Sequence, residues 1–221
     1  MPSSRKERVL TFSPMPEMAT GLTNLLIIVS ALWCLSALPA SADLRLWRLF
    51  FCSVAFAAAC GAAVHCLVLP EAAEHAVWAL FDLCFGPLLT SLAAAALKDV
   101  RGPLPLWATV LLLALAAVTS LGMILLLLKF GFRAQFPLAA AAAGLAMAVY
   151  LVMQLYGVIV RHRSRGGLLG LGIILLAGLT WLLGDFTVTL GPLQMNQVSF
   201  LHLGLALALP FFAFSAGPSR K

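Results

Sequence analysis

The chain has 221 residues, of which 62% are hydrophobic and only 10% are charged. Soluble domains average about 45–50% apolar and about 25% charged residues, so this composition, with a mean hydropathy of +1.04, excludes an ordinary soluble domain. The net charge of +6 does not indicate nucleic-acid binding, because the 14 lysines and arginines are scattered between apolar blocks. An integral membrane protein with short tails is the class that fits.

Long apolar runs recur along the whole chain. A helix needs about 20 mostly apolar residues to cross the ~30 Å hydrocarbon core of a bilayer. Seven segments meet this requirement and predict spans at residues 18–39, 49–69, 76–97, 104–128, 136–160, 167–189 and 198–216. The runs are continuous rather than alternating, which disfavours a membrane β-barrel. We therefore predict an all-α fold, a single bundle of seven transmembrane helices over residues 1–221 in contact with the lipid bilayer, in an oligomeric state that the sequence leaves open.

The ends of the sixth and first spans carry particular signals. Gly191-Pro192 is expected to close the sixth span. A basic tail precedes the first span, which is followed by Ala40-Ser41-Ala42, a pattern similar to a signal-peptidase site. Because the apolar run is longer than the usual 7–15-residue signal core, a resident first span is the favoured interpretation, and a cleaved signal is the alternative.

Basic residues are divided unequally between the two sides of the predicted bundle. Nine of the 14 lysines and arginines fall on the side of the C-terminus, and five fall on the side of the N-terminus. Positive residues are enriched in cytoplasmic connections. The distribution predicts a multi-pass protein with its C-terminus in the cytoplasm and its N-terminus outside the cell or in a lumen.

Ionisable residues within the spans gather at one level. A charged residue at the centre of a membrane helix costs about 2.5–3.5 kcal/mol, so such residues often mark functional sites. The start of an odd span and the end of an even span lie on the same face of the membrane, and the residues at these places lie at depths of about 5–9 Å. They are Glu17, His65, Asp82, Asp185 and His202, with Asn24, Asn196 and Ser199 at the same level. We expect one polar cavity that opens on the side of the N-terminus; the alternative is that each side chain reaches the interface separately.

Two histidines in such a cavity favour metal binding. Neutral imidazoles are good zinc ligands, and a catalytic zinc usually has three protein ligands plus water. His65 and His202 would supply two ligands, and Asp185 is the third that we select from Asp82, Asp185 and Glu17. A nearby carboxylate, which we take to be Asp82, would serve as the catalytic base or orient a ligand. Axial ligation of haem by the two histidines is a further use of such a pair.

Four segments resemble motifs of the seven-span superfamily of alkaline ceramidases and progestin/adiponectin-type receptors, and they occur in the same order. They are Pro16-Glu17 leading into Gly21-Leu22-Thr23-Asn24-Leu25-Leu26, the segment Cys60-Gly61-Ala62-Ala63-Val64-His65, the segment Phe81-Asp82-Leu83-Cys84-Phe85-Gly86-Pro87, and Trp181-Leu182-Leu183-Gly184-Asp185. Two positions depart from the superfamily pattern. Gly61 stands where the motif has serine, and His202 stands alone where the motif has two histidines four residues apart, with Val198 and Ala206 at those offsets. The resemblance implies a zinc site within the bundle and a lipid substrate.

The residues and the resemblance together predict a membrane-embedded, zinc-dependent hydrolase of a lipid amide or ester. The alternatives are a non-catalytic seven-span protein, such as a receptor or scaffold, and a transporter of a small molecule or ion. A transporter is less favoured because no clear internal repeat or paired broken helix is visible. A retinal protein is disfavoured because the seventh span has no lysine to form a Schiff base.

Overall fold

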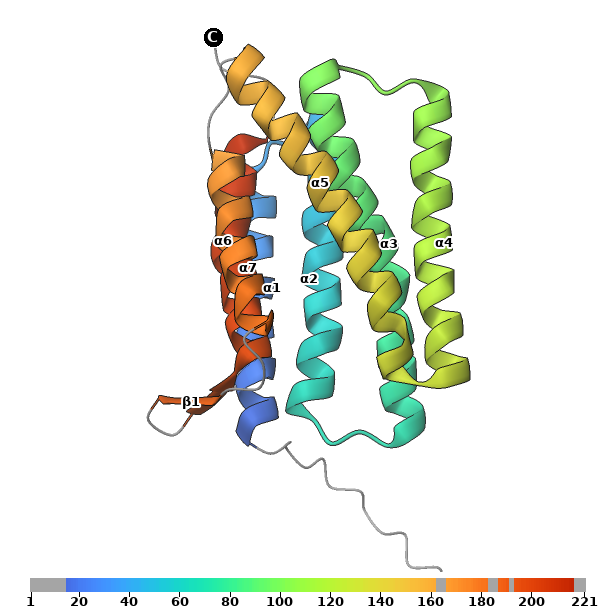
Figure 1. The fold of residues 1–221 in the computed structure, drawn as a ribbon, viewed down its shortest axis with the longest axis vertical. Coiled ribbons are helices and arrows are strands. Elements are labelled where there is room, and N and C mark those ends of the chain that lie inside the picture. The colour runs from blue at the N-terminus through green and yellow to red at the C-terminus, as the bar shows by residue number, and fades with distance from the viewer. Residues whose placement is uncertain (1–14, 162–165, 183–186, 191–192, 217–221) are drawn as a thin grey trace, which may run out of the picture.

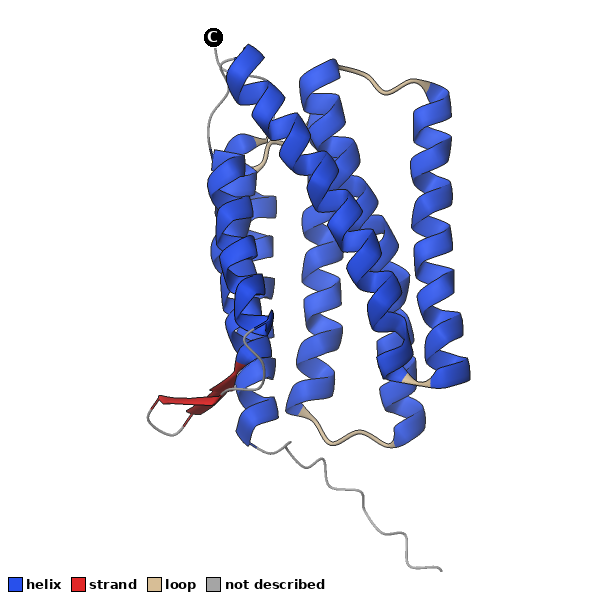
Figure 2. Ribbon diagram, in the orientation of Figure 1, coloured by secondary structure: helices blue, strands red, loops and turns tan. Residues whose placement is uncertain are grey.

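The computed structural model describes residues 15–161, 166–182, 187–190 and 193–216. These residues form an all-α bundle with one small hairpin, as Figures 1 and 2 show. The helices are α1 (Met15–Ala37), α2 (Arg45–Cys66), α3 (Glu71–Arg101), α4 (Leu106–Phe130), α5 (Phe136–Arg161), α6 (Gly166–Leu182) and α7 (Gln197–Ser215). Short 3-10 helices, η1 (Ala42–Leu44) and η2 (Phe132–Gln135), precede α2 and α5. The predicted fold class is confirmed.

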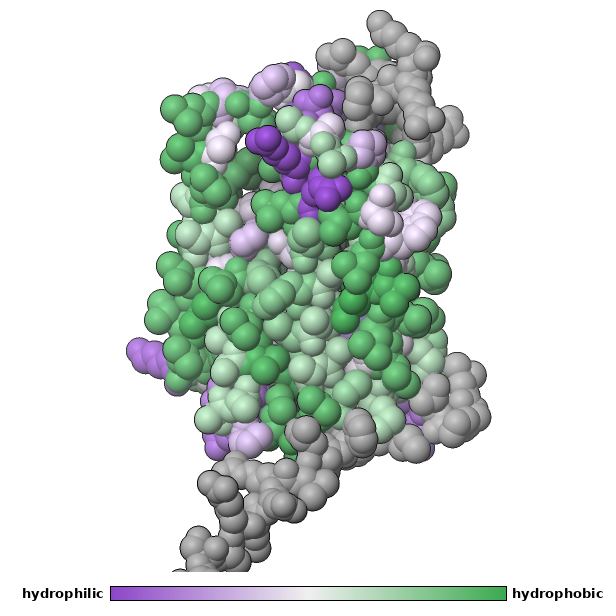
Figure 3. All heavy atoms as spheres, turned by 180° about the vertical axis from the view of Figure 1, so that it is seen from behind, coloured by the Kyte–Doolittle hydropathy of each residue, from purple (hydrophilic) through white to green (hydrophobic). Residues whose placement is uncertain are grey.

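The helices have the length and composition of membrane spans. Among the described residues, six helices are long and apolar enough to cross a bilayer, namely α1 to α5 and α7. The sixth helix, α6, has 17 residues and is a shorter apolar helix. Figure 3 shows apolar side chains over the middle of the molecule, with hydrophilic residues mainly toward its two ends. The protein is therefore a multi-pass membrane protein whose lateral surface contacts lipid.

The expectation that the sixth span runs to residue 189 is wrong. Helix α6 ends at Leu182, and residues 187–190 form strand β1 (Thr187–Leu190), which pairs antiparallel with β2 (Leu193–Asn196). The register places Thr187 opposite Asn196 and Leu190 opposite Leu193. The β-branched run Thr187-Val188-Thr189 favours an extended backbone over a helix. Gly191-Pro192, expected to close the sixth span, lies outside the described residues.

Neighbouring helices pack in chain order, and the bundle closes when α7 returns to α1. The contacts pair α1 with α2 and α7, α2 with α3, α3 with α4 and α5, and α6 with α7. Figure 1 shows α5 crossing obliquely over α3 and α4 standing at the edge. At the end of the bundle opposite the hairpin, an aromatic core joins α2, α5 and α7. Its members are Trp47, Phe50, Phe51, Tyr150 and Phe212, with the Tyr150 and Phe212 ring centroids 5.0 Å apart.

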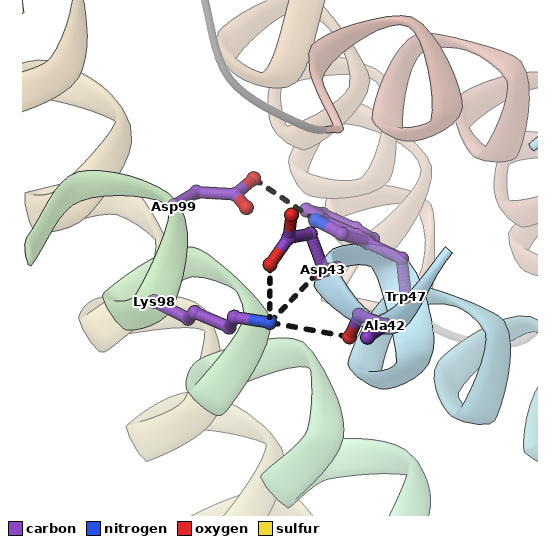
Figure 4. A network of polar contacts seen from close by, with 5 residues as sticks. All are labelled: Ala42, Asp43, Trp47, Lys98 and Asp99. Atoms are coloured by element: carbon purple, nitrogen blue, oxygen red, sulfur yellow. Dashed lines mark hydrogen bonds and ion pairs between the residues drawn. The ribbon is translucent and has the colours of Figure 1, made fainter. Parts of the chain in front are cut away.

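Polar contacts at this same end tie the α1–α2 connection to the end of α3 (Figure 4). Lys98 Nζ donates to the carbonyls of Ala42 and Asp43 at 3.3 and 3.0 Å and lies 3.5 Å from the Asp43 carboxylate. Trp47 Nε1 donates to Asp99 Oδ2 at 2.9 Å. Arg48 donates to the carbonyls of residues 35 and 38, which lack helical partners at the end of α1. These contacts fix the ends of the first three helices relative to one another.

Helix α3 contains a proline that is compensated by α4. Pro87 has no N–H, so the carbonyl of Leu83 loses its helical donor. Ser120 Oγ from α4 donates to that carbonyl at 3.1 Å and accepts from the Gly86 N–H at 3.2 Å. Gly86 allows this approach, because a Cβ at that position would collide with the carbonyl oxygen of Ala116. The proline thus becomes the point at which α3 and α4 are held together.

Candidate functional site

A polar cluster lies where α7 begins, against the first turns of α1. Asn196 caps α7, and its Oδ1 accepts from the Ser199 N–H at 2.9 Å, as asparagine commonly does at this position. The same oxygen accepts from the hydroxyls of Ser199 at 3.1 Å and Thr20 at 3.3 Å. The Thr20 and Ser199 hydroxyls are 3.0 Å apart. The hairpin and the helix cap together bring the polar start of α7 against α1.

His202 lies one turn deeper in α7 and faces the same helix. Its Nδ1 is 3.5 Å from the Thr23 hydroxyl, which itself donates to the Thr20 carbonyl at 2.8 Å. Because the single Thr23 hydroxyl proton is used in that bond, the hydroxyl oxygen is available to accept from Nδ1. In the tautomer that donates from Nδ1, Nε2 of His202 is an acceptor, which is the form of imidazole that binds a metal.

His65 approaches the cluster from the end of α2. It is half-buried, and its ring meets Trp78 of α3 edge-on with centroids 6.0 Å apart. Its imidazole is close enough to interact electrostatically with His202 and with Glu17 and Glu74. The end of α2 and the start of α7 both lie against the first turns of α1, where the backbone of His65 is beside Gly21 and the side chain of His202 is beside Thr23.

Asn24 lies between α1 and α2, beside Gly61, about one helical turn farther into the bundle than His65. It is buried, and its Nδ2 donates to the Thr20 carbonyl at 3.1 Å. A Cβ at Gly61 would lie 3.0 Å from both the nitrogen and the oxygen of this amide. Glycine at position 61, where the superfamily motif has serine, thus makes room for the Asn24 side chain.

Asp82 has a different partner from the one that the sequence suggested. It is completely buried in α3, and with the amide nitrogen of Gln135 turned toward it, Gln135 donates to Oδ1 at 2.9 Å and to Oδ2 at 2.6 Å. Gln135 is itself 1% exposed and lies in η2, just before α5. Sequence reasoning missed Gln135 because it considered ionisable residues first, although an amide in the short connection on the same side of the membrane was a visible signal.

Glu17 and Asp185 are the remaining ionisable residues that the sequence placed in the site. Glu17 is exposed in the first turn of α1, a favourable position for an acidic residue at a helix N-terminus. Asp185 lies outside the described residues. Within the part of the chain that the structure describes, no group of three or more His, Cys, Asp and Glu side chains is arranged to hold a metal ion. Among the described residues, Asp82 therefore does not join His65 and His202 in a group of three potential ligands.

The fold and this cluster define a polytopic helical membrane protein with a buried polar site between its first, second and seventh helices. The chain belongs to a protein family of unknown function, DUF6962, whose model matches residues 19–220. No curated protein matches the chain, and no solved structure matches it.

Proposed function

We propose that the protein is a membrane-embedded, metal-dependent hydrolase of a lipid amide or ester, similar to the ceramidase superfamily that its motifs resemble. The observation that carries this proposal is that His202 of α7 and His65 of α2 both lie beside the same turns of α1, at Thr23 and Gly21, next to a polar cluster. Ionisable residues inside a membrane bundle are costly, and those that are retained there commonly mark functional sites.

The residues divide into ligands and supporting groups. His65 and His202 hold the metal, and Asp185, which follows α6 in the sequence, is the proposed third ligand. Thr23 orients the His202 imidazole through Nδ1, in the way that outer hydrogen bonds orient metal ligands. A zinc ion bound there supplies an activated water with a pKa near 7. Asp82 is left out of the ligand set because Gln135 bonds to both oxygens of its carboxylate.

Metal analysis of the purified protein tests this function. We expect about one zinc per chain, the stoichiometry of a mononuclear catalytic site, and loss of that zinc in His65→Ala, His202→Ala and Asp185→Ala. His75→Ala, in the first turns of α3, is the matched control and should keep its zinc. A zinc content far below one per chain, unchanged by His65→Ala, contradicts the proposal.

A second candidate function is a non-catalytic membrane protein in which the same cluster joins helices. Two observations favour it: every buried polar side-chain atom that the structure describes has a hydrogen-bond partner, and the described residues contain no three-ligand group. In this case His65→Gln and His202→Gln lower the thermal stability and leave the metal content unchanged. The same preparations therefore separate the two candidates.

We also propose that the C-terminus faces the cytoplasm and the N-terminus faces outside or a lumen. The support is the excess of basic residues on the C-terminal side and the position of Arg48 and Lys98 at that end of the bundle. This orientation requires α6 to cross the membrane. Its 17 residues rise about 25 Å, which is at the short end of the range for a spanning helix.

A further inference from the structure

An apolar groove runs between α1 and α2 on the outside of the bundle, near the polar cluster. Its volume is about 400 Å³. Its lining is almost entirely apolar and includes Met18, Leu22 and Leu25 from α1 and Ala62, Ala63 and Cys66 from α2. The side chains that line the groove are smaller on α2 than on α1, so the groove is shallower on the side of α2.

The groove and the polar cluster share the same helical turns. Leu22 and Leu25 flank Thr23 and Asn24 along α1, while Ala63 and Cys66 flank His65 along α2. Successive residues of a helix point about 100° apart, so one face of each turn carries the polar groups and another face carries the groove. The helices are in close contact here, because a Cβ at Gly21 would collide with Cys66 Sγ. The groove thus lies at the depth of the histidines.

The membrane determines what can fill this groove. Leu22 and Leu25 are 40% and 44% exposed on helices that cross the bilayer, so the groove opens toward lipid and not toward water. From residue 18 to residue 25, α1 rises about 10 Å, against about 15 Å for the hydrocarbon of one leaflet. The groove is therefore long enough to hold most of one acyl chain of a lipid.

We propose that the groove binds one hydrocarbon chain of a lipid from the leaflet on the N-terminal side, with the polar linkage of that lipid at the level of His65 and His202. The role of this lipid as a substrate rests on the proposed function, whereas the binding of its chain does not. A second copy of the protein or the chain's own N-terminal segment are the other occupants that an experiment must distinguish.

Photocrosslinking locates the occupant directly. The full-length protein is reconstituted in phosphatidylcholine vesicles with about 1 mol% of a lipid probe that carries a diazirine near the middle of one acyl chain, as either an N-acyl amide or a phosphatidylcholine. We expect labelled peptides from α1 residues 18–25 and α2 residues 62–67 to exceed those from α4, whose surface is also exposed to lipid. Labelling by the amide probe alone indicates a selected lipid, and equal labelling by both probes indicates a general acyl-chain site.

Variants that fill the groove make the experiment specific. Ala63→Trp should reduce groove labelling at least several-fold, and Leu22→Trp, at a lipid-exposed position that tolerates a large side chain, should do the same. Cys52→Trp, at an exposed position of α2 about 16 Å along the helix from Ala63, is the matched control and should leave labelling unchanged. Even labelling of all lipid-facing helices, or labelling unaffected by both groove variants, would overturn the proposal. A photoreactive amino acid placed at position 22 tests the other occupants, and its crosslinking to a second copy or to residues 1–14 would also overturn the proposal. Zinc content is measured on the same samples, so a failed hydrolase proposal is distinguishable from a failed groove proposal.

Discussion

At the scale of single residues, the cost of burial decides which polar side chains need a partner. Asp82 is fully enclosed, and Gln135 supplies donors to both of its oxygens. His202 has the Thr23 hydroxyl as its partner, and Asn24 donates to the Thr20 carbonyl. A buried polar group without a partner costs about 1–3 kcal/mol, and more if it is charged, so these pairings contribute to stability whatever the protein does.

The Asp82–Gln135 pair provides a prediction at this scale. Gln135→Leu removes both donors and leaves the carboxyl group of Asp82 buried without them, so we expect it to destabilise the fold by about 1–3 kcal/mol. Thermal unfolding of the detergent-solubilised protein measures the change. Arg133→Gln, at an exposed position two residues away, is the control.

A double-mutant cycle shows whether the cost belongs to this pair. Asp82→Leu combined with Gln135→Leu replaces both groups by apolar ones, and we expect this variant to be more stable than Gln135→Leu alone. A Gln135→Leu protein that unfolds at the wild-type temperature would show that the hydrogen bonds do not form.

At the scale of helices, the ends and irregularities of each helix follow from local chemistry that a neighbouring helix completes. Pro70 and Gly102 border α3, and Gly102 has φ 87° and ψ −158°, a positive-φ conformation that glycine adopts without steric cost. Acidic residues in its first turn and basic residues in its last turn match the helix dipole, which explains why α3 is longer than the apolar run at 76–97. Pro87, in contrast, is accommodated only because Ser120 of α4 takes the place of the missing donor.

The Ser120 contact predicts a rescue. Ser120→Ala leaves the Leu83 carbonyl without a donor, so we expect a loss of about 1–2 kcal/mol of stability. Pro87→Ala restores a backbone N–H to α3, and the same Ser120→Ala substitution should cost less in that background. Thr109→Ala, an exposed hydroxyl on the same helix, is the control. Equal costs in both backgrounds would mean that Ser120 does not compensate for the proline.

At the scale of the whole molecule, the two ends of the bundle differ. One end carries the histidines, the α7 cap and the hairpin, and the other carries the aromatic core and the Lys98 and Arg48 contacts. The proposed topology places the end with Lys98 and Arg48 at the cytoplasmic interface, because basic residues are enriched there. It places the end with the polar cluster and the exposed Glu17 outside or in a lumen.

Labelling of introduced cysteines tests this orientation. The five native cysteines are all free, so they can be replaced without loss of a disulfide. In that background Val68→Cys, in the α2–α3 connection, should react with an impermeant maleimide in intact cells or sealed vesicles of native orientation. Pro103→Cys, in the α3–α4 connection, should react only after permeabilisation. The opposite pattern would invert the proposed topology.

The extent to which the sequence predicted this structure differs between the bundle and its site. Helices α4 and α5 match the predicted spans closely, because a long apolar run has few alternatives in a bilayer. The predicted end of the sixth span was wrong. Residues 187–190 are apolar enough to extend a span, but their β-branched side chains favour the strand that the structure has. Of the residues that the sequence placed at one level, His202, Asn196 and Ser199 lie at the start of α7, and His65 lies at the end of α2 with its ring against Trp78.

What the sequence determined alone is the class of protein, because the thickness of the membrane and the rise of a helix set how many apolar residues a span needs. Only the tertiary structure decided that Asp82 bonds to Gln135, that Asn24 fills the space above Gly61, and that Ser120 compensates Pro87. These choices depend on how each helix is rotated about its axis and which neighbour it packs against, and the packing of the whole bundle sets both.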